Sequence, residues 1–138
     1  METTLLPTAA GRPRSVDVTR GIEALYATGH WLLLQDRAGD AACVFRAMAL
    51  LAPTDERSWL ALGACHEALG QPSQAIQMYG TGRTLARPAV RCDVARARVL
   101  RARDCEDAAE ALLEQAKEAA EALDDIALIE LVAAERRF

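Results

Sequence analysis

The feature that most constrains the fold of this chain is an internal repeat of thirty-four residues. Two stretches, Leu25 to Pro53 and Trp59 to Pro88, carry the same residue types at the same internal spacing. Two pairs of small residues match, Gly29 with Gly63 and Ala41 with Ala75. Two pairs of large residues match as well, Leu25 with Trp59 and Phe45 with Tyr79. A weaker third copy follows one period later, at Ala97, Ala109 and Leu113. Units of this size cannot bury their apolar faces alone, so they are expected to stack on one another.

A period of thirty-four residues, with an aromatic residue four positions after the second small one, is typical of a tetratricopeptide (TPR) array. Each TPR is a pair of antiparallel helices. The composition agrees, because 51% of the chain is hydrophobic but only 4% is aromatic, and Ala and Leu, which make up most of the rest, favour helices. We therefore predict an all-α fold: three TPR helical hairpins stacked in a right-handed superhelix, followed by a C-terminal capping helix.

The predicted organisation has three parts. Residues 1–16 lack hydrophobic periodicity and are expected to form a flexible N-terminal arm. Residues 17–123 hold the three TPR-like repeats, and residues 124–138 form the capping helix, whose acidic flank suits a solvated outer face. The expected limits of the repeats are about 22–55, 56–89 and 90–123.

Short polar residues mark the expected helix starts. The N-cap candidates are Asp17 or Thr19, Asp40, Thr54 or Asp55, and Asp124 or Asp125. A glycine inside a helix costs about 1 kcal/mol relative to Ala. Because Gly80 and Gly82 both lie in the second helix of the second repeat, that helix is expected to end early.

The repeated small and large residues are interpreted as the contacts between helices. We expect Gly29 to face Ala41 and Gly63 to face Ala75, because larger side chains would push the helix axes apart. The large residues are then expected to fill the space above and below each contact. The full predicted packing set is Leu25, Gly29, Ala41, Phe45, Trp59, Leu62, Gly63, Ala75, Tyr79, Ala97, Ala109 and Leu113.

The charge is distributed unevenly, although its sum, −4, is too acidic for a general nucleic-acid binder. Seven arginines and only one acid, Asp93, lie between Arg83 and Arg103. Eleven acids and a single lysine follow between Asp104 and Glu135. Two interpretations stay open: the basic helix pairs with the acidic C-terminal helices, or the basic strip meets an acidic segment of a partner.

No pattern in the sequence indicates catalysis, a metal or a cofactor, and we expect the protein not to be an enzyme. The cysteines form no CxxC pair and have no metal-ligand spacing to His30 or His66. We expect reduced, buried thiols at all four of them, Cys43, Cys65, Cys92 and Cys105. Trp59 and His66 are expected to be packing residues. With no signal-peptide core and no apolar run of eighteen residues, the expected location is the cytoplasm, with no membrane partner.

The residues between the marker positions are more specific than the spacing. Residues 55–70 read DERSWLALGACHEALG and lead into AIQMY at 75–79, while the first repeat has YATG at 26–29 and DAACVF at 40–45. Over residues 22–118 the chain resembles the class II chaperones of type III secretion, the translocator chaperones. The resemblance implies a three-repeat TPR domain that binds an extended segment of a hydrophobic translocator in its concave groove. Binding would keep that substrate soluble and competent for secretion.

The resemblance also implies which residues contact the bound translocator, called the client below, because in this family the first helix of each repeat lines the groove. The implied groove residues are Tyr26, His30, Leu33, Leu34, Leu60, Ala64, Glu67, Val94, Arg98 and Arg101. The family often has tyrosines where this chain has His30 and Leu33, so its groove is expected to be less aromatic. A homodimer or a small helical co-chaperone is a further possible partner. The alternative function is a TPR adaptor or co-chaperone that docks other proteins of the secretion apparatus.

Overall fold

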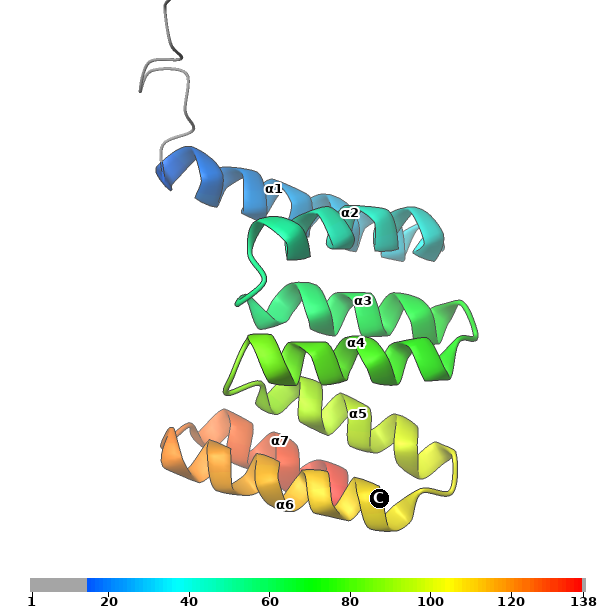
Figure 1. The fold of residues 1–138 in the computed structure, drawn as a ribbon, viewed down its shortest axis with the longest axis vertical. Helices are drawn as coiled ribbons and strands as arrows, with labels where there is room; N and C mark the ends of the chain where they lie inside the picture. The colour runs from blue at the N-terminus through cyan, green and yellow to red at the C-terminus, as the bar shows by residue number, and fades with distance from the viewer. Residues whose placement is uncertain (1–14, 138) are drawn as a thin grey trace, which may run out of the picture.

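The computed structural model describes residues 15–137, and these form seven α-helices and no strand (Figure 1). The predicted all-α fold is therefore confirmed. Residues 1–14, which hold most of the expected arm, lie outside the described residues. None of the described helices is long and apolar enough to cross a membrane. The helices are α1 (Ser15–Leu34), α2 (Ala38–Leu51), α3 (Glu56–Ala68), α4 (Pro72–Leu85), α5 (Val90–Ala102), α6 (Glu106–Ala122) and α7 (Ile126–Arg136).

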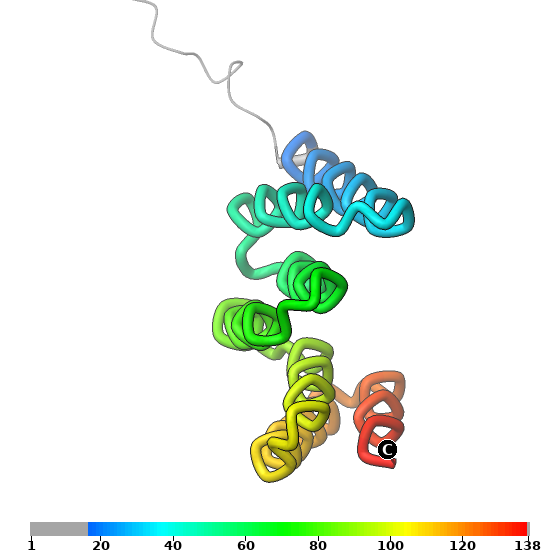
Figure 2. Tube along the Cα trace, turned by 90° about the vertical axis from the view of Figure 1, so that its right-hand side faces the viewer, coloured from blue at the N-terminus to red at the C-terminus, as the bar shows by residue number. Residues whose placement is uncertain are grey.

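The helices stack as successive hairpins along the long axis of the molecule (Figure 1). Each helix packs on the next one in the chain, and α5 also contacts α3 and α7. The side view in Figure 2 places α1, α3, α5 and α7 on one side and α2, α4 and α6 on the other. We call the first of these sides the inner face and the second the outer face. In Figure 2, α1 and α7 project beyond α3 and α5, so the inner face is curved.

Two of the predicted N-caps are confirmed. Asp55 precedes α3 and accepts a hydrogen bond from the backbone N–H of Arg57 at 3.0 Å. Asp125 precedes α7 and accepts one from the backbone N–H of Leu128 at 3.2 Å. Each cap satisfies a backbone donor that has no partner within its own helix.

The starts of the first two helices were predicted a few residues too late. α1 already includes Ser15, so Asp17 lies in its first turn. α2 begins at Ala38, and Asp40 is therefore not the N-cap; it lies in the first turn and accepts a hydrogen bond from Nε of Arg37 at 2.9 Å. A carboxylate in the first turn is still favourable, because it interacts with the positive end of the helix dipole.

The glycines of α4 do not end the helix, which continues to Leu85, so the expected early stop is wrong. Gly82 is buried, and a Cβ atom there would lie 2.7 Å from Cβ of Trp59 and 2.8 Å from Sγ of Cys92. Gly82 thus lets α4 approach α3 and α5 more closely than any side chain would allow.

Each glycine of the repeat signature lies against an aromatic ring. A Cβ atom on Gly29 would be 2.5 Å from Cζ of Phe45, and one on Gly63 would be 2.0 Å from Cε1 of Tyr79. The atoms nearest to each glycine thus belong to the ring one turn after the signature alanine, and this ring fills the space beside the glycine. Of the expected packing residues, only Leu25 and Trp59 are not classed as buried.

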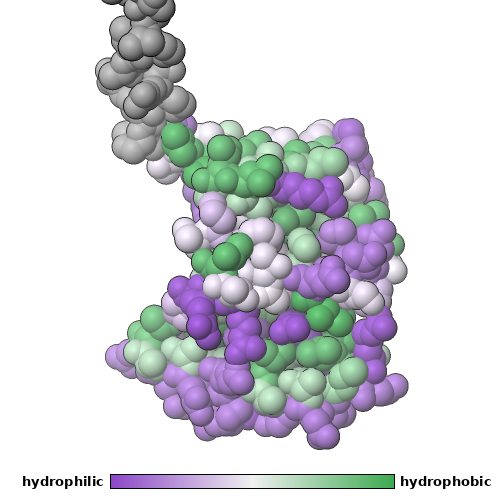
Figure 3. All heavy atoms as spheres, viewed as in Figure 1, coloured by the Kyte–Doolittle hydropathy of each residue, from purple (hydrophilic) through white to green (hydrophobic). Residues whose placement is uncertain are grey.

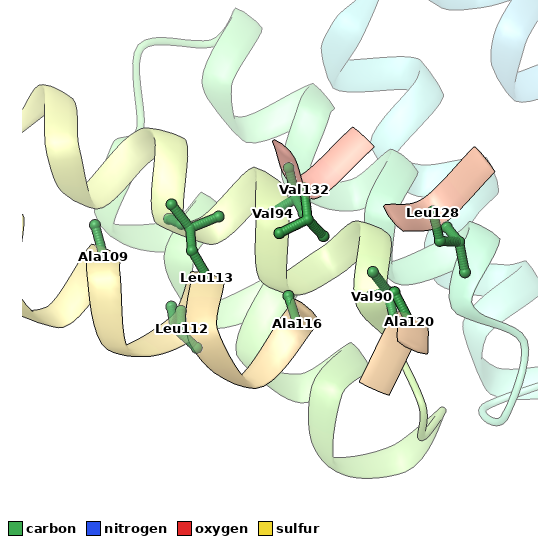
Figure 4. Close-up of a cluster of buried hydrophobic side chains, with 10 residues drawn as sticks. Val90, Val94, Ala109, Leu112, Leu113, Ala116, Ala120, Leu128 and Val132 are labelled. Atoms are coloured by element: carbon green, nitrogen blue, oxygen red, sulfur yellow. The ribbon is translucent and has the colours of Figure 1, made fainter. Parts of the chain in front are cut away.

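The last helix covers the apolar flank that the third hairpin would otherwise expose. Figure 4 shows side chains of α5, α6 and α7 meeting in one buried cluster. In it Val94 of α5 and Leu113 of α6 share the core with Val132 of α7. α7 thus closes the C-terminal end of the stack.

Candidate peptide-binding face

The N-terminal part of the inner face carries a small aromatic cluster. The rings of Tyr26 and His30 in α1 meet edge to face, with centroids 4.5 Å apart. The fully buried ring of Phe45 contacts both, at 6.3 Å from Tyr26 and 5.7 Å from His30. Edge-to-face pairs of this kind are favourable and directional. The buried ring therefore holds a half-buried tyrosine and an exposed histidine in defined positions on the surface.

Arg57 ties α3 to α1 beside this cluster. Its Cζ atom lies 4.6 Å from the ring centroid of Tyr26, a cation–π contact. Its guanidinium group donates to Glu23 at 2.7 Å and to Asp55 at 2.8 Å. These hydrogen bonds lower the pKa of both carboxyl groups. Glu23 and Arg57 are one repeat apart in the sequence, so the contact joins equivalent positions of neighbouring helices.

The middle of the inner face is apolar at one end of α3 and charged at the other. Leu60 is half-buried and Ala64 is exposed. Glu67 accepts hydrogen bonds from the hydroxyl of Tyr79 and from Nη2 of Arg98, the latter at 3.1 Å. Burial and the neighbouring carboxylate raise the pKa of Tyr79, so its hydroxyl stays protonated and donates. Glu67 thus links α3 to both α4 and α5.

The C-terminal part of the inner face is charged. Arg101 forms ion pairs with Glu135 of α7 at 3.3 Å and with Glu106 at 3.6 Å. It also donates to the backbone carbonyl of Glu135 at 2.9 Å. A hollow of about 320 Å³ is lined by Arg98, Arg101, Ala102 and Glu135. The inner face therefore changes from aromatic on α1 to charged between α5 and α7.

One predicted groove residue lies away from the surface. Val94 is only 4% exposed, because it packs into the cluster that α7 completes (Figure 4). The other nine predicted residues are exposed or half-buried, among them Leu34, which is 81% exposed, and Leu33, which is half-buried. The side chain of Val94 is thus unavailable to a ligand in this structure. The repeat pattern did not indicate this, because it does not show how far α7 reaches over α5.

Trp59 and His66 have structural partners, as predicted. The indole N–H of Trp59 donates to the carbonyl of Pro53 at 2.8 Å. His66 is 7% exposed, and its Nδ1 lies 2.7 Å from Oε1 of Gln71. Trp59 therefore bonds to the end of the first repeat, and His66 is engaged within the second.

The prediction of four buried thiols is wrong for two of them. Cys65 and Cys92 are buried, but Cys43 and Cys105 are exposed. Cys105 is the N-cap of α6 and lies in the turn after α5, while Cys43 is on the solvent side of α2. Among the described residues, no group of three or more His, Cys, Asp or Glu side chains could hold a metal ion.

The first interpretation of the basic strip, that it pairs within the protein, is correct in part. Arg101 pairs with the acidic C-terminal helices, as the first interpretation expected. Arg98 pairs instead with Glu67, and Arg83 with Asp93. Four arginines of the strip form no ion pair within 4.0 Å in the part of the chain that is described: Arg87, Arg91, Arg96 and Arg103.

The outer face carries an apolar surface that the sequence reasoning missed. Leu50 is 85% exposed and Leu51 60%, and Figure 3 shows apolar atoms gathered over the C-terminal end of α2. A hollow of about 510 Å³ lies beside them, with Trp59 and Leu85 in its lining. The signal was present, because Leu50 and Leu51 extend the apolar residues of α2 beyond the face that packs on α1 and α3.

Comparisons with known proteins identify the family. No family model matches the chain, and the comparison with curated proteins gives no match. Solved structures do match. PcrH from Pseudomonas aeruginosa is 30% identical with a TM-score of 0.73, over 93% of this chain and 96% of that one. PcrH in complex with the chaperone binding region of PopB is 30% identical with a TM-score of 0.73, over 84% and 94%.

A third structure is the type III secretion translocator chaperone SycD of Yersinia enterocolitica, 28% identical with a TM-score of 0.75, over 84% of this chain and 87% of that one. The shared residues extend over nearly the whole length of each relative, and the helices superpose along the same length. The chain therefore belongs to the class II chaperones of type III secretion, the translocator chaperones.

Proposed function

We propose that the protein binds an extended segment of a translocator on its inner face and keeps that translocator soluble and competent for secretion. The observation that carries the proposal is the row of accessible aromatic and apolar side chains along α1 and α3. Tyr26 and Leu60 occupy the same repeat position in successive helices, and neither is fully buried. PcrH, which is 30% identical, was solved with the chaperone binding region of PopB.

The gradient along the inner face indicates how such a segment binds. Apolar anchors of the client lie against Tyr26, His30 and Leu60, where burial of their surface supplies the affinity. The polar backbone of the client lies nearer Arg98, whose guanidinium group has donors beyond the one used by Glu67. Binding of this kind needs no chemical step, so the proposed role is not enzymatic. It takes place in the bacterial cytoplasm, before export.

Co-expression tests the proposal. The translocator candidates encoded beside the gene are each produced with the chaperone, and soluble client is measured. We expect Leu60→Asp and Tyr26→Ala to reduce the soluble client strongly, because both remove apolar contact area from the inner face. Leu50→Asp is the matched control, since it places the same charge on the outer face. Equal effects of Leu60→Asp and Leu50→Asp, with both variants folded, would contradict the proposal.

A further inference from the structure

The outer face has a basic feature that client binding on the inner face does not use. Two hollows of about 820 and 570 Å³ lie on either side of Arg83 and Arg87, which line both. Arg96 of α5 lines the first hollow and Asp93 of α5 lines the second. Figure 3 shows hydrophilic atoms over the C-terminal end of α4 on this face. We call these four residues the arginine cluster.

The charges of the arginine cluster do not balance. Asp93, which is 6% exposed, pairs with Arg83, with 3.4 Å between Oδ1 and Nε. Neither Arg87 nor Arg96 has an ion pair within residues 15–137. Burial raises the pKa of Asp93, whereas the positive charges of all three arginines lower it. Three guanidinium groups therefore surround a single carboxylate.

Hydrogen-bonding capacity is also left over. In the described part of the chain, Oδ1 of Asp93 and Nε of Arg96 are buried without a hydrogen-bond partner. A buried polar atom without a partner costs free energy, so the arginines and the carboxylate of the cluster do not satisfy one another fully. Apolar side chains lie at the same place, because Ile76 and the half-exposed Leu85 line the first hollow.

We propose that the arginine cluster is a docking site for an acidic segment of a partner protein, with glutamate or aspartate side chains next to an apolar one. Carboxylates form strong, often bidentate, hydrogen bonds with arginine. The carboxylates of the segment pair with the exposed Arg87, and its apolar side chain packs on Leu85. Because the site is on the outer face, an acidic partner and a translocator segment occupy different surfaces and bind together.

Fluorescence anisotropy tests the proposal with a labelled peptide in which pairs of glutamates flank single leucines. The comparison peptide has glutamine in place of each glutamate. We expect the glutamate peptide to bind and the glutamine peptide not to bind. Arg87→Gln is expected to weaken the affinity for the glutamate peptide about fivefold or more, as the loss of a charged hydrogen bond predicts.

The matched control is Arg91→Gln/Arg103→Gln, which removes two exposed arginines outside the cluster. We expect it to change the affinity by less than about twofold, because charges far from the ligand are screened. Arg83→Gln is avoided as the main variant because it breaks the ion pair with Asp93. Equal losses in the control and in Arg87→Gln would overturn the proposal. The proposal would also be overturned if the peptide does not bind and Arg87 instead binds a duplex DNA, a phosphatidylglycerol vesicle or a second copy of the chain.

Discussion

Gly29 and Phe45 are packed so closely that a methyl group on Gly29 would lie 2.5 Å from Cζ of the ring. The same relationship recurs between the glycine and the tyrosine of the second repeat. In the third repeat Ala97 and Leu113 occupy the two positions, and both are fully buried. The repeats thus show two solutions to one packing problem, either no side chain beside a ring or a methyl group beside a smaller aliphatic residue.

The first prediction exchanges one solution for the other. Gly29→Ala alone is expected to destabilise the fold by about 1–3 kcal/mol, the usual cost of overpacking a core. Phe45→Leu alone leaves a cavity and also destabilises it. The double variant is expected to lose less stability than the two single variants lose together, because it recreates the pair of the third repeat. Urea unfolding of all four proteins measures the coupling, and additive losses would show that the two positions are independent.

The second prediction separates the two glycines of α4. Gly82→Ala is expected to lower stability, because its methyl group would lie 2.7 Å from Cβ of Trp59, an atom held close to the backbone. Gly80→Ala is expected to raise it by up to about 1 kcal/mol, the usual difference in helix propensity. Its methyl group would approach only the flexible end of Arg96, at 3.4 Å. Thermal unfolding of the two variants checks the opposite signs, and a loss in Gly80→Ala would contradict this account.

The third prediction concerns the thiols. Cys43 and Cys105 are exposed and are expected to react at once with a chromogenic disulfide reagent at neutral pH. Burial raises the pKa of Cys65 to about 11 and also raises the pKa of Cys92, so both stay protonated and enclosed. They are expected to react only as the protein unfolds. Cys43→Ala/Cys105→Ala is the control, and any fast phase that remains in it would contradict the burial of the other two.

The predicted fold was correct because the thirty-four-residue period depends on side-chain size, which is visible in the sequence. Which atoms touch was not visible. The spacing paired Gly29 with Ala41, whereas helical side chains lean towards the preceding turn, so the ring of Phe45 reaches the glycine first. Gly82 was likewise interpreted as a helix breaker, because propensity describes an isolated helix and not the close approach of its neighbours.

The candidate site was predictable only as far as the repeat register extends. That register places Tyr26, Leu60 and Val94 at one position of successive helices. The register does not predict which residues a later helix covers, and α7 buries Val94. The arginine cluster could not be assembled from the register at all, because it joins the end of α4 to α5 and depends on how the two helices pack.

The last prediction concerns pH. Hydrogen bonds from Arg57 lower the pKa of Glu23 and Asp55 below their ordinary values of 4.5 and 3.8. A carboxyl group with a lowered pKa in the folded state stabilises that state at neutral pH, and this contribution is lost as the pH falls through the folded-state pKa. Wild type is therefore expected to exceed Arg57→Gln in stability at pH 7, and the difference is expected to shrink towards pH 3.

Buried acids do not disturb this comparison. Burial raises the pKa of Glu56 and Asp93, so their contribution to stability changes with pH in the opposite direction, but it does so equally in both proteins. Arg103→Gln is the control, because that exposed arginine forms no ion pair among the described residues. A difference between wild type and Arg57→Gln that stays constant from pH 7 to pH 3 would mean that Arg57 acts through its contact with the ring of Tyr26 and not through the two carboxylates.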